Sequence, residues 1–169
     1  MSKPAVILVG ADKGGVGKTM TTRTLLDYFD ARKINCRAFD TEVPRGTLKR
    51  FHPGITDLVD ITSVADQMRI FDTINSAGVT IVDIRAGLLS STLQALDDIG
   101  FIEAARAGEL VLGIVHILGP SIASLEEIGV IAPYVLPAAI SWSRITSIIR
   151  ASSTGIRQRR THTSNSLRA

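Results

Sequence analysis

Residues 10–22 read GADKGGVGKTMTT, and they directly follow the apolar run Ala5–Val9. The stretch holds three closely spaced glycines: Gly14, Gly15 and Gly17. Backbone N–H groups in such a loop can close around phosphate oxygens, because no Cβ stands in the way. A helix is expected to start near Lys18, and its positive dipole end would face the same point. Lys18 adds a mobile positive charge and the Thr19 hydroxyl a ligand for Mg²⁺, so the stretch predicts a phosphate-binding loop between a strand and a helix.

The loop departs from the general pattern G-x-x-x-x-G-K-[ST], whose first glycine would fall on Asp12. What stands instead is KGGVGKT, with a second lysine at Lys13. This motif resembles the deviant Walker A motif of the ParA/MinD family of ATPases, and Lys13 matches the signature lysine of that family. The resemblance implies ATP and Mg²⁺ as ligands and an ATP-dependent homodimer in which Lys13 contacts phosphate across the interface. The implied nucleotide-binding residues are Lys13, Gly14, Gly15, Val16, Gly17, Lys18, Thr19 and Met20. The alternative is a glycine-rich turn that binds nothing.

Apolar runs alternate with segments of helical periodicity along the chain, which predicts an α/β fold with helices on both faces of a parallel sheet. The low aromatic content of 5% also favours this class over a β-sandwich. The expected strands are 5–10, 36–39, 79–82 and 110–118. The expected helices are 19–32, 55–76, 88–106 and 121–128, the last capped by Ser121, and residues 40–54 are expected to be a loop. The resemblance narrows this to a three-layer fold of the P-loop NTPase type.

Acidic residues follow two of the expected strands, at the sheet edge where open α/β proteins bind ligands. Asp83 lies in VTIVDIRAG (residues 79–87), which resembles the switch II segment of the family, with Asp83 and Gly87 matching. The resemblance implies that Asp83 reaches Mg²⁺ through water, and Thr19, Asp40 and Asp83 form the implied metal site. A purely local alternative is that Asp83 caps the following helix.

The segment FDTEVPRG (residues 39–46) resembles the switch I pattern D-x-D-P-Q-G less closely. Asp40 matches the first acid, and Glu42 stands where the second belongs, with Val43 as one extra residue. In the family the second acid orients the attacking water, so the implied catalytic residues are Lys13, Glu42 and Asp40. Glutamate is one methylene longer, and a displacement of about 1 Å can lower a rate ~100-fold. We therefore expect slow hydrolysis. The alternatives are that Glu42 is only a solvated loop acid, or that Asp40 orients the water in its place.

The charge of the chain is unevenly distributed. Residues 1–127 hold 13 Lys and Arg against all 16 acids, whereas residues 128–169 hold six arginines and no acid. Residues 1–139 are expected to form the ATPase domain and 140–169 a poorly ordered basic tail. The resemblance covers residues 4–128 and then ends without a base-reading motif, so we expect a sheet incomplete at the C-terminus and a truncated or frameshifted end. The arginines could contact DNA phosphates non-specifically: Arg144, Arg150, Arg157, Arg159, Arg160 and Arg168.

The composition excludes several classes of protein. The single cysteine, Cys36, allows no internal disulfide and no cysteine-based cluster, which excludes the nitrogenase iron-protein branch and favours a cytoplasmic setting. No apolar stretch is long enough to span a membrane. The resemblance implies an ATPase that serves DNA or plasmid partition, plasmid transfer or cellular positioning, with DNA or an adaptor protein as partner. The alternatives are an ATP-dependent biosynthetic enzyme of the dethiobiotin synthetase or cobyrinate amidase type, and an inactive remnant.

Overall fold

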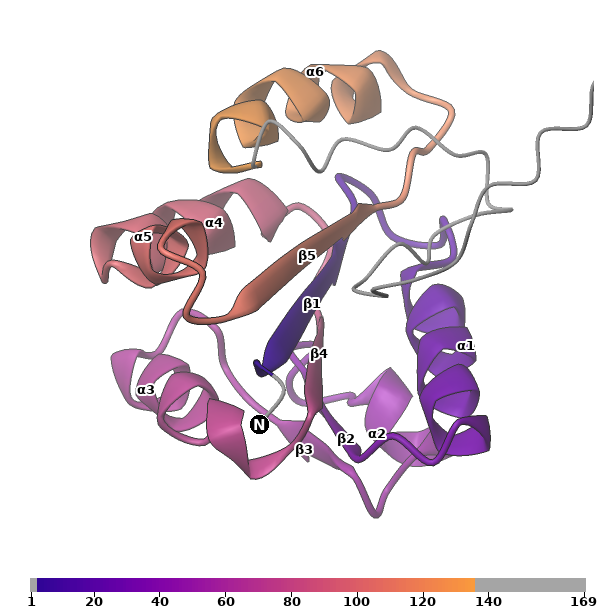
Figure 1. Cartoon of the computed structure of the whole chain (residues 1–169). Helices are drawn as coiled ribbons and strands as arrows, with labels where there is room; N and C mark the ends of the chain where they lie inside the picture. Colours follow the sequence, from indigo (N-terminus) through magenta and orange to yellow (C-terminus); the bar gives the residue numbers. More distant parts are fainter. Residues whose placement is uncertain (1–2, 136–169) are drawn as a thin grey trace, which may run out of the picture. The chain divides into compact units, whose positions relative to one another are not determined.

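Strands and helices alternate in the computed structural model of this protein, which describes residues 3–135 (Figure 1). The strands are β1 (Ala5–Gly10), β2 (Cys36–Asp40), β3 (Thr56–Leu58), β4 (Val79–Asp83) and β5 (Val111–His116). The helices are α1 (Lys18–Ala31), α2 (Thr47–Phe51), α3 (Val64–Asp72), α4 (Leu89–Asp98), α5 (Phe101–Arg106) and α6 (Ile122–Ile131). Two 3-10 turns lie at Ile74–Ser76 and Ala132–Tyr134.

The strands form one parallel sheet in the order β3-β2-β4-β1-β5. Its register aligns Asp83 with Val9 on one side and with Asp40 on the other. Because all strands run the same way, the ends of β1, β2 and β4 meet at one edge of the sheet, as parallel strands require. The loop after Gly10 and both acids are therefore neighbours in space although they are far apart in sequence.

Helices cover both faces of the sheet and bury a separate apolar cluster on each, which confirms the predicted three-layer α/β fold (Figure 1). One cluster joins α1 and α2 to the sheet: Val9, Leu26, Ala38, Leu48, Val79, Ile81 and Val115. The other cluster is larger and lies on the opposite face, beneath α3, α4, α5 and the end of α6. Its most buried members include Val6, Leu8, Ile70, Ile84, Leu89, Leu93, Leu96 and Ile102. The apolar strands thus sit between two helical layers, as expected for a parallel sheet.

Two expectations for residues 40–76 were wrong. The expected loop 40–54 contains the short helix α2, and the expected helix 55–76 begins instead with strand β3. β3 pairs with β2, and the Lys49 ammonium donates to the Thr56 carbonyl from α2. Only the second half of the expected helix exists, as α3. Tertiary pairing rather than local periodicity therefore decides this region.

The expected helix 88–106 was also wrong as one element, because it is split into α4 and α5. Gly100 separates the two helices with φ +78°, a left-handed conformation that a helix interior does not allow and that glycine adopts freely. The predicted boundary at residue 139 and the basic tail 140–169 lie outside the described residues.

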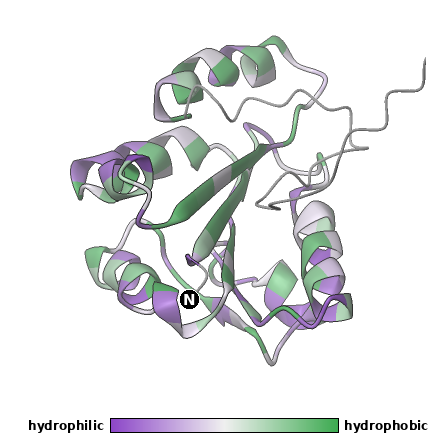
Figure 2. Cartoon of the chain, viewed as in Figure 1, coloured by the Kyte–Doolittle hydropathy of each residue, from purple (hydrophilic) through white to green (hydrophobic). Residues whose placement is uncertain are grey.

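Helix α6 begins at the predicted cap, since the Ser121 side chain accepts a hydrogen bond from the Ser124 amide. Its inner side is partly polar: the Glu127 carboxylate lies 2.8 Å from the His116 ring, and both side chains are largely buried. Apolar residues point outward instead, with Ile122 75% and Leu125 60% exposed, and Figure 2 shows several hydrophobic bands on this helix. Across residues 3–135, no helix combines the length and apolar character needed to cross a membrane.

Candidate functional site

The predicted phosphate loop connects β1 to α1, at the edge where the strand ends meet. Gly15 has φ +78° and Gly17 has φ +103°, so the chain turns back twice through conformations that favour glycine. A Cβ added at either position would meet no atom within 4 Å. The glycine-rich half of the loop therefore lines open space with bare backbone.

The first turn of α1 faces this open space. Gly17 is its N-cap, and neither a capping side chain nor an acid in the first turn satisfies the free N–H groups. A helix of 14 residues thus presents an unneutralised positive end beside the glycines. This arrangement favours an anion.

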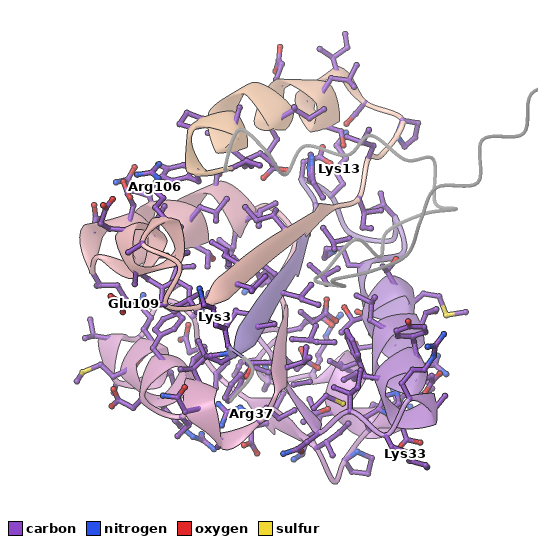
Figure 3. The ribbon with its side chains drawn as sticks, viewed as in Figure 1. Lys3, Lys13, Lys33, Arg37, Arg106 and Glu109 are labelled. Carbon is purple, nitrogen blue, oxygen red and sulfur yellow. The ribbon has the colours of Figure 1, made fainter. Side chains whose placement is uncertain are left out.

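Both loop lysines lie where they could hold such an anion. The Lys18 ammonium donates to the Lys13 carbonyl over 3.4 Å, so the Lys18 side chain folds back across the loop. Lys13 is exposed and stands on the loop beyond the end of β1 (Figure 3). Of the other predicted binding residues, Met20 is exposed, whereas Val16 packs towards Gly119 in the loop after β5.

Asp83 is the buried acid of the site. Asp83 is only 4% exposed to solvent, and its Oδ1 atom has no hydrogen-bond partner among the described residues. Burial raises the pKa of Asp83 to about 6, and repulsion from Asp40 adds to the rise. Three groups act against this rise and lower the pKa: the Thr19 and Thr22 hydroxyls and the Lys18 ammonium. These groups therefore lie close to the carboxylate. Asp83 does not cap α4, because the N-cap of α4 is Leu88 with no side-chain hydrogen bond.

Asp40 is equally buried, but its carboxylate is fully engaged by backbone. Oδ1 accepts from the Glu42 amide at 2.9 Å, and Oδ2 accepts from the Leu48 and Lys49 amides at 2.7 and 3.2 Å. The latter two amides belong to the first turn of α2, so Asp40 acts as the cap that Gly46 cannot provide. This role explains why α2 exists, and it turns both Asp40 oxygens towards the loop that follows β2.

Glu42 is held in the same loop. Its Oε2 atom accepts a 2.6 Å hydrogen bond from the Thr47 hydroxyl, and its backbone carbonyl accepts from the Gly46 amide. The predicted role of Glu42 in orienting water therefore falls to its other carboxylate oxygen, Oε1, while Thr47 holds Oε2.

Two threonines that the sequence analysis did not single out belong to this site. Thr22 is fully buried beside Asp83, and Thr41 links the ends of β2 and β4. The Thr41 hydroxyl donates to the Asp83 carbonyl at 3.1 Å and accepts from the Arg85 amide at 2.7 Å. Thr41 could have been identified from the sequence, because it directly follows an acid that ends an expected strand.

The donor set fits a hydrated Mg²⁺ with a polyphosphate better than a metal held by protein alone. Within residues 3–135 there is no group of three or more His, Cys, Asp or Glu side chains that could hold an ion. The Asp83 carboxylate lies near the Thr19 hydroxyl and has one unpaired oxygen, and Mg²⁺ accepts few protein ligands when phosphates and waters complete its shell. The open glycine backbone would receive the phosphates.

No protein-family model matches this chain, and a search of curated proteins found no match either.

Proposed function

We propose that this protein binds Mg·ATP in the loop between β1 and α1. The observation that carries the proposal is the juxtaposition of the bare glycine backbone, the folded-back Lys18 side chain and the unpaired, buried Asp83 oxygen. Glycine N–H groups and the α1 N-terminus would hold phosphate oxygens, and Lys18 would neutralise part of their charge. Thr19 would bind Mg²⁺ directly, and Asp83 would accept from a water in its shell.

The proposed reaction is slow, Mg²⁺-dependent hydrolysis of ATP. Charge on the transferred phosphoryl group would be stabilised by Lys18 and Lys13 together. The slow rate is supported by the hydrogen bonds that occupy both oxygens of Asp40 and one oxygen of Glu42, because these bonds restrict how either carboxylate could orient water. Asp40 is accordingly proposed as a support of the loop more than as a metal ligand.

We further propose that ATP switches the chain between monomer and homodimer, in the manner of the ParA/MinD ATPases that the KGGVGKT motif resembles. The exposed Lys13 side chain supports this idea, since a residue that acts across an interface must be accessible in the monomer. Such a switch would serve partition, transfer or positioning in the cytoplasm, with DNA or an adaptor protein as partner. The six arginines proposed for DNA contact lie outside the described residues.

Calorimetric titration of the full chain with Mg·ATP tests the binding proposal. Lys18→Ala should weaken binding about 10- to 100-fold, because a hydrogen-bonded charge on phosphate contributes about 1.5–3 kcal/mol. Lys33→Asn is the matched control: Lys33 lies at the far end of α1 in a left-handed conformation that asparagine tolerates, and Figure 3 places it away from Lys13. Folded wild-type protein that takes up no Mg·ATP at millimolar concentration would refute the proposal.

An assay of ATP turnover, with and without a small carboxylic acid, separates the biosynthetic alternative. Turnover that depends on a small carboxylic acid would indicate an enzyme of that type, whereas turnover without one supports the switch. For the DNA partner, affinity that survives removal of residues 141–169 would exclude the arginine-rich tail as the contact.

A further inference from the structure

Asp12 opens the phosphate loop, but its side chain points to another element. Its Oδ2 atom accepts a 3.0 Å hydrogen bond from the Ser121 hydroxyl, and the two residues are 109 positions apart. The other carboxylate oxygen, Oδ1, is buried and has no hydrogen-bond partner among the described residues. A Cβ on Gly119 would lie 3.7 Å from that atom, so the loop after β5 approaches Asp12 closely.

Ser121 is also the N-cap of α6, so its hydroxyl bonds to both the phosphate loop and this helix. Its oxygen accepts from the Ser124 amide at 3.3 Å while its proton is donated to Asp12. The first turn of α6 contains no acid of its own. Asp12 thus supplies, from the phosphate loop, the negative charge that a helix N-terminus favours.

The charge of Asp12 is maintained by its surroundings. Burial alone would raise the pKa of Asp12, but the hydroxyls of Ser124 and Ser121 and the charge of Lys13 bring it below the ordinary value of 3.8. The carboxylate is therefore ionised at neutral pH, next to the loop proposed to receive a triphosphate.

The entrance of the loop is also held from its other side. The Gly87 amide, in the segment after β4, donates to the Ala11 carbonyl at 2.9 Å, and a Cβ on Gly87 would lie 3.5 Å from the Asp12 carbonyl. Val16 contacts the β5 side, since its Cγ1 would lie 3.1 Å from a Cβ on Gly119. Asp12 therefore lies between the segment after β4 and the loop that leads into α6.

We propose that Asp12 is a positioning residue through which occupancy of the phosphate loop is transmitted to α6. This inference rests on the proposed function. Like charges repel each other more strongly in a partly buried site than in bulk water, because the effective dielectric constant there is lower. A bound triphosphate would therefore repel the ionised Asp12 carboxylate. The Asp12–Ser121 bond loosens, and the first turn of α6 loses its cap charge.

Hydrogen exchange of the full chain, followed by mass spectrometry, tests this coupling. Saturating Mg·ATP should speed exchange in residues 119–126 several-fold in the wild type. Asp12→Asn keeps an acceptor for Ser121 but removes the charge, so basal exchange should lie between that of the wild type and that of Asp12→Ala, and Mg·ATP should not change it. Asp12→Ala should show fast exchange with or without nucleotide. Asp72→Asn, an exposed change on α3, should respond like the wild type.

Calorimetry on the same variants gives a second readout that a merely structural role would not produce. Asp12→Asn should bind Mg·ATP several-fold more tightly than the wild type, because a like charge near the phosphates is gone, whereas a damaged loop would bind more weakly. Binding by the wild type without any change in residues 119–126, or a response that persists in Asp12→Asn, would overturn this inference alone. Wild-type protein that binds no Mg·ATP would overturn it together with the proposed function.

Discussion

Asp40 and Asp83 stand opposite each other in the register of β2 and β4, yet their carboxylates have different environments. Asp40 accepts three backbone N–H groups, whereas the Oδ1 atom of Asp83 has no partner. Satisfied buried acids support a fold, while unsatisfied ones reduce stability unless a ligand completes them. The two acids therefore predict opposite responses to substitution.

Asp83→Asn should stabilise the ligand-free protein at pH 7. The folded-state pKa of Asp83, about 6, exceeds the ordinary 3.8, so the folded chain holds the proton more tightly than the unfolded chain does. Its contribution to stability is greatest below about pH 4 and falls as pH rises to about 6. A rise of about two pKa units corresponds to roughly 3 kcal/mol, and urea unfolding should show a gain of about 1–3 kcal/mol at pH 7.

The gain from Asp83→Asn should shrink to near zero below about pH 4, where the wild-type carboxyl is protonated in both states. Asp97→Asn, an exposed change on α4, should leave stability within about 0.5 kcal/mol of wild type at either pH. A destabilised Asp83→Asn protein at pH 7 would contradict the burial argument.

Asp40→Ala should lower the free energy of unfolding by about 3 kcal/mol, because three amides, two of them at the start of α2, lose a buried charged acceptor. Urea unfolding measures the loss, and Asp97→Ala serves as the exposed control. If Asp40→Ala unfolds like the wild type, Asp40 does not support the loop, and a direct role with Mg²⁺ becomes the better interpretation.

Gly17→Ala should be destabilising although it causes no clash. Its φ of +103° is unfavourable for alanine by about 1–2 kcal/mol, and the new Cβ would stand in the proposed phosphate space. Thermal unfolding measures the first effect and Mg·ATP calorimetry the second. Gly54→Ala adds the same methyl group at an open position without a left-handed φ, and it should change neither quantity appreciably. Equal melting temperatures for the two variants would argue against the described loop conformation.

Lys13→Ala and Lys18→Ala should separate binding from association. Lys13 is exposed on the monomer, so its loss should leave Mg·ATP affinity within a few-fold of wild type but abolish the ATP-dependent increase in mass. Lys18→Ala should weaken both Mg·ATP binding and the ATP-dependent association. Light scattering with and without Mg·ATP measures the mass, and Lys33→Asn should dimerise normally. A Lys13→Ala protein that still dimerises on ATP would exclude a role for Lys13 across an interface.

The sequence predicted the parts of the fold that local patterns determine. Apolar runs identified β1 and β4, helical spacing identified α1, and Ser121 was correctly expected to cap α6. β3 escaped prediction because it has only three residues, two of them exposed, and exists through its pairing with β2. α2 escaped it because its cap, Asp40, lies seven residues before the helix begins.

The sequence likewise predicted only those parts of the candidate site that local patterns determine. A contiguous motif indicated the loop, and the position of Asp83 after an apolar run indicated an acid at the same edge. The partners of Asp40 and Glu42 could not be read from the pattern, because α2 was not expected. The Asp12–Ser121 contact depends on the adjacency of β1 and β5 in the sheet, which no local pattern encodes.

One hydroxyl, that of Thr41, fastens the segment after β2 to the segment after β4. The Thr41 amide adds a third bond, to the same Asp83 carbonyl at 3.1 Å, so the two segments are tied to each other and should move as one unit. Valine at this position would keep the shape of the side chain and remove the two hydroxyl bonds, so that of the Thr41 links only the amide bond to the Asp83 carbonyl would remain.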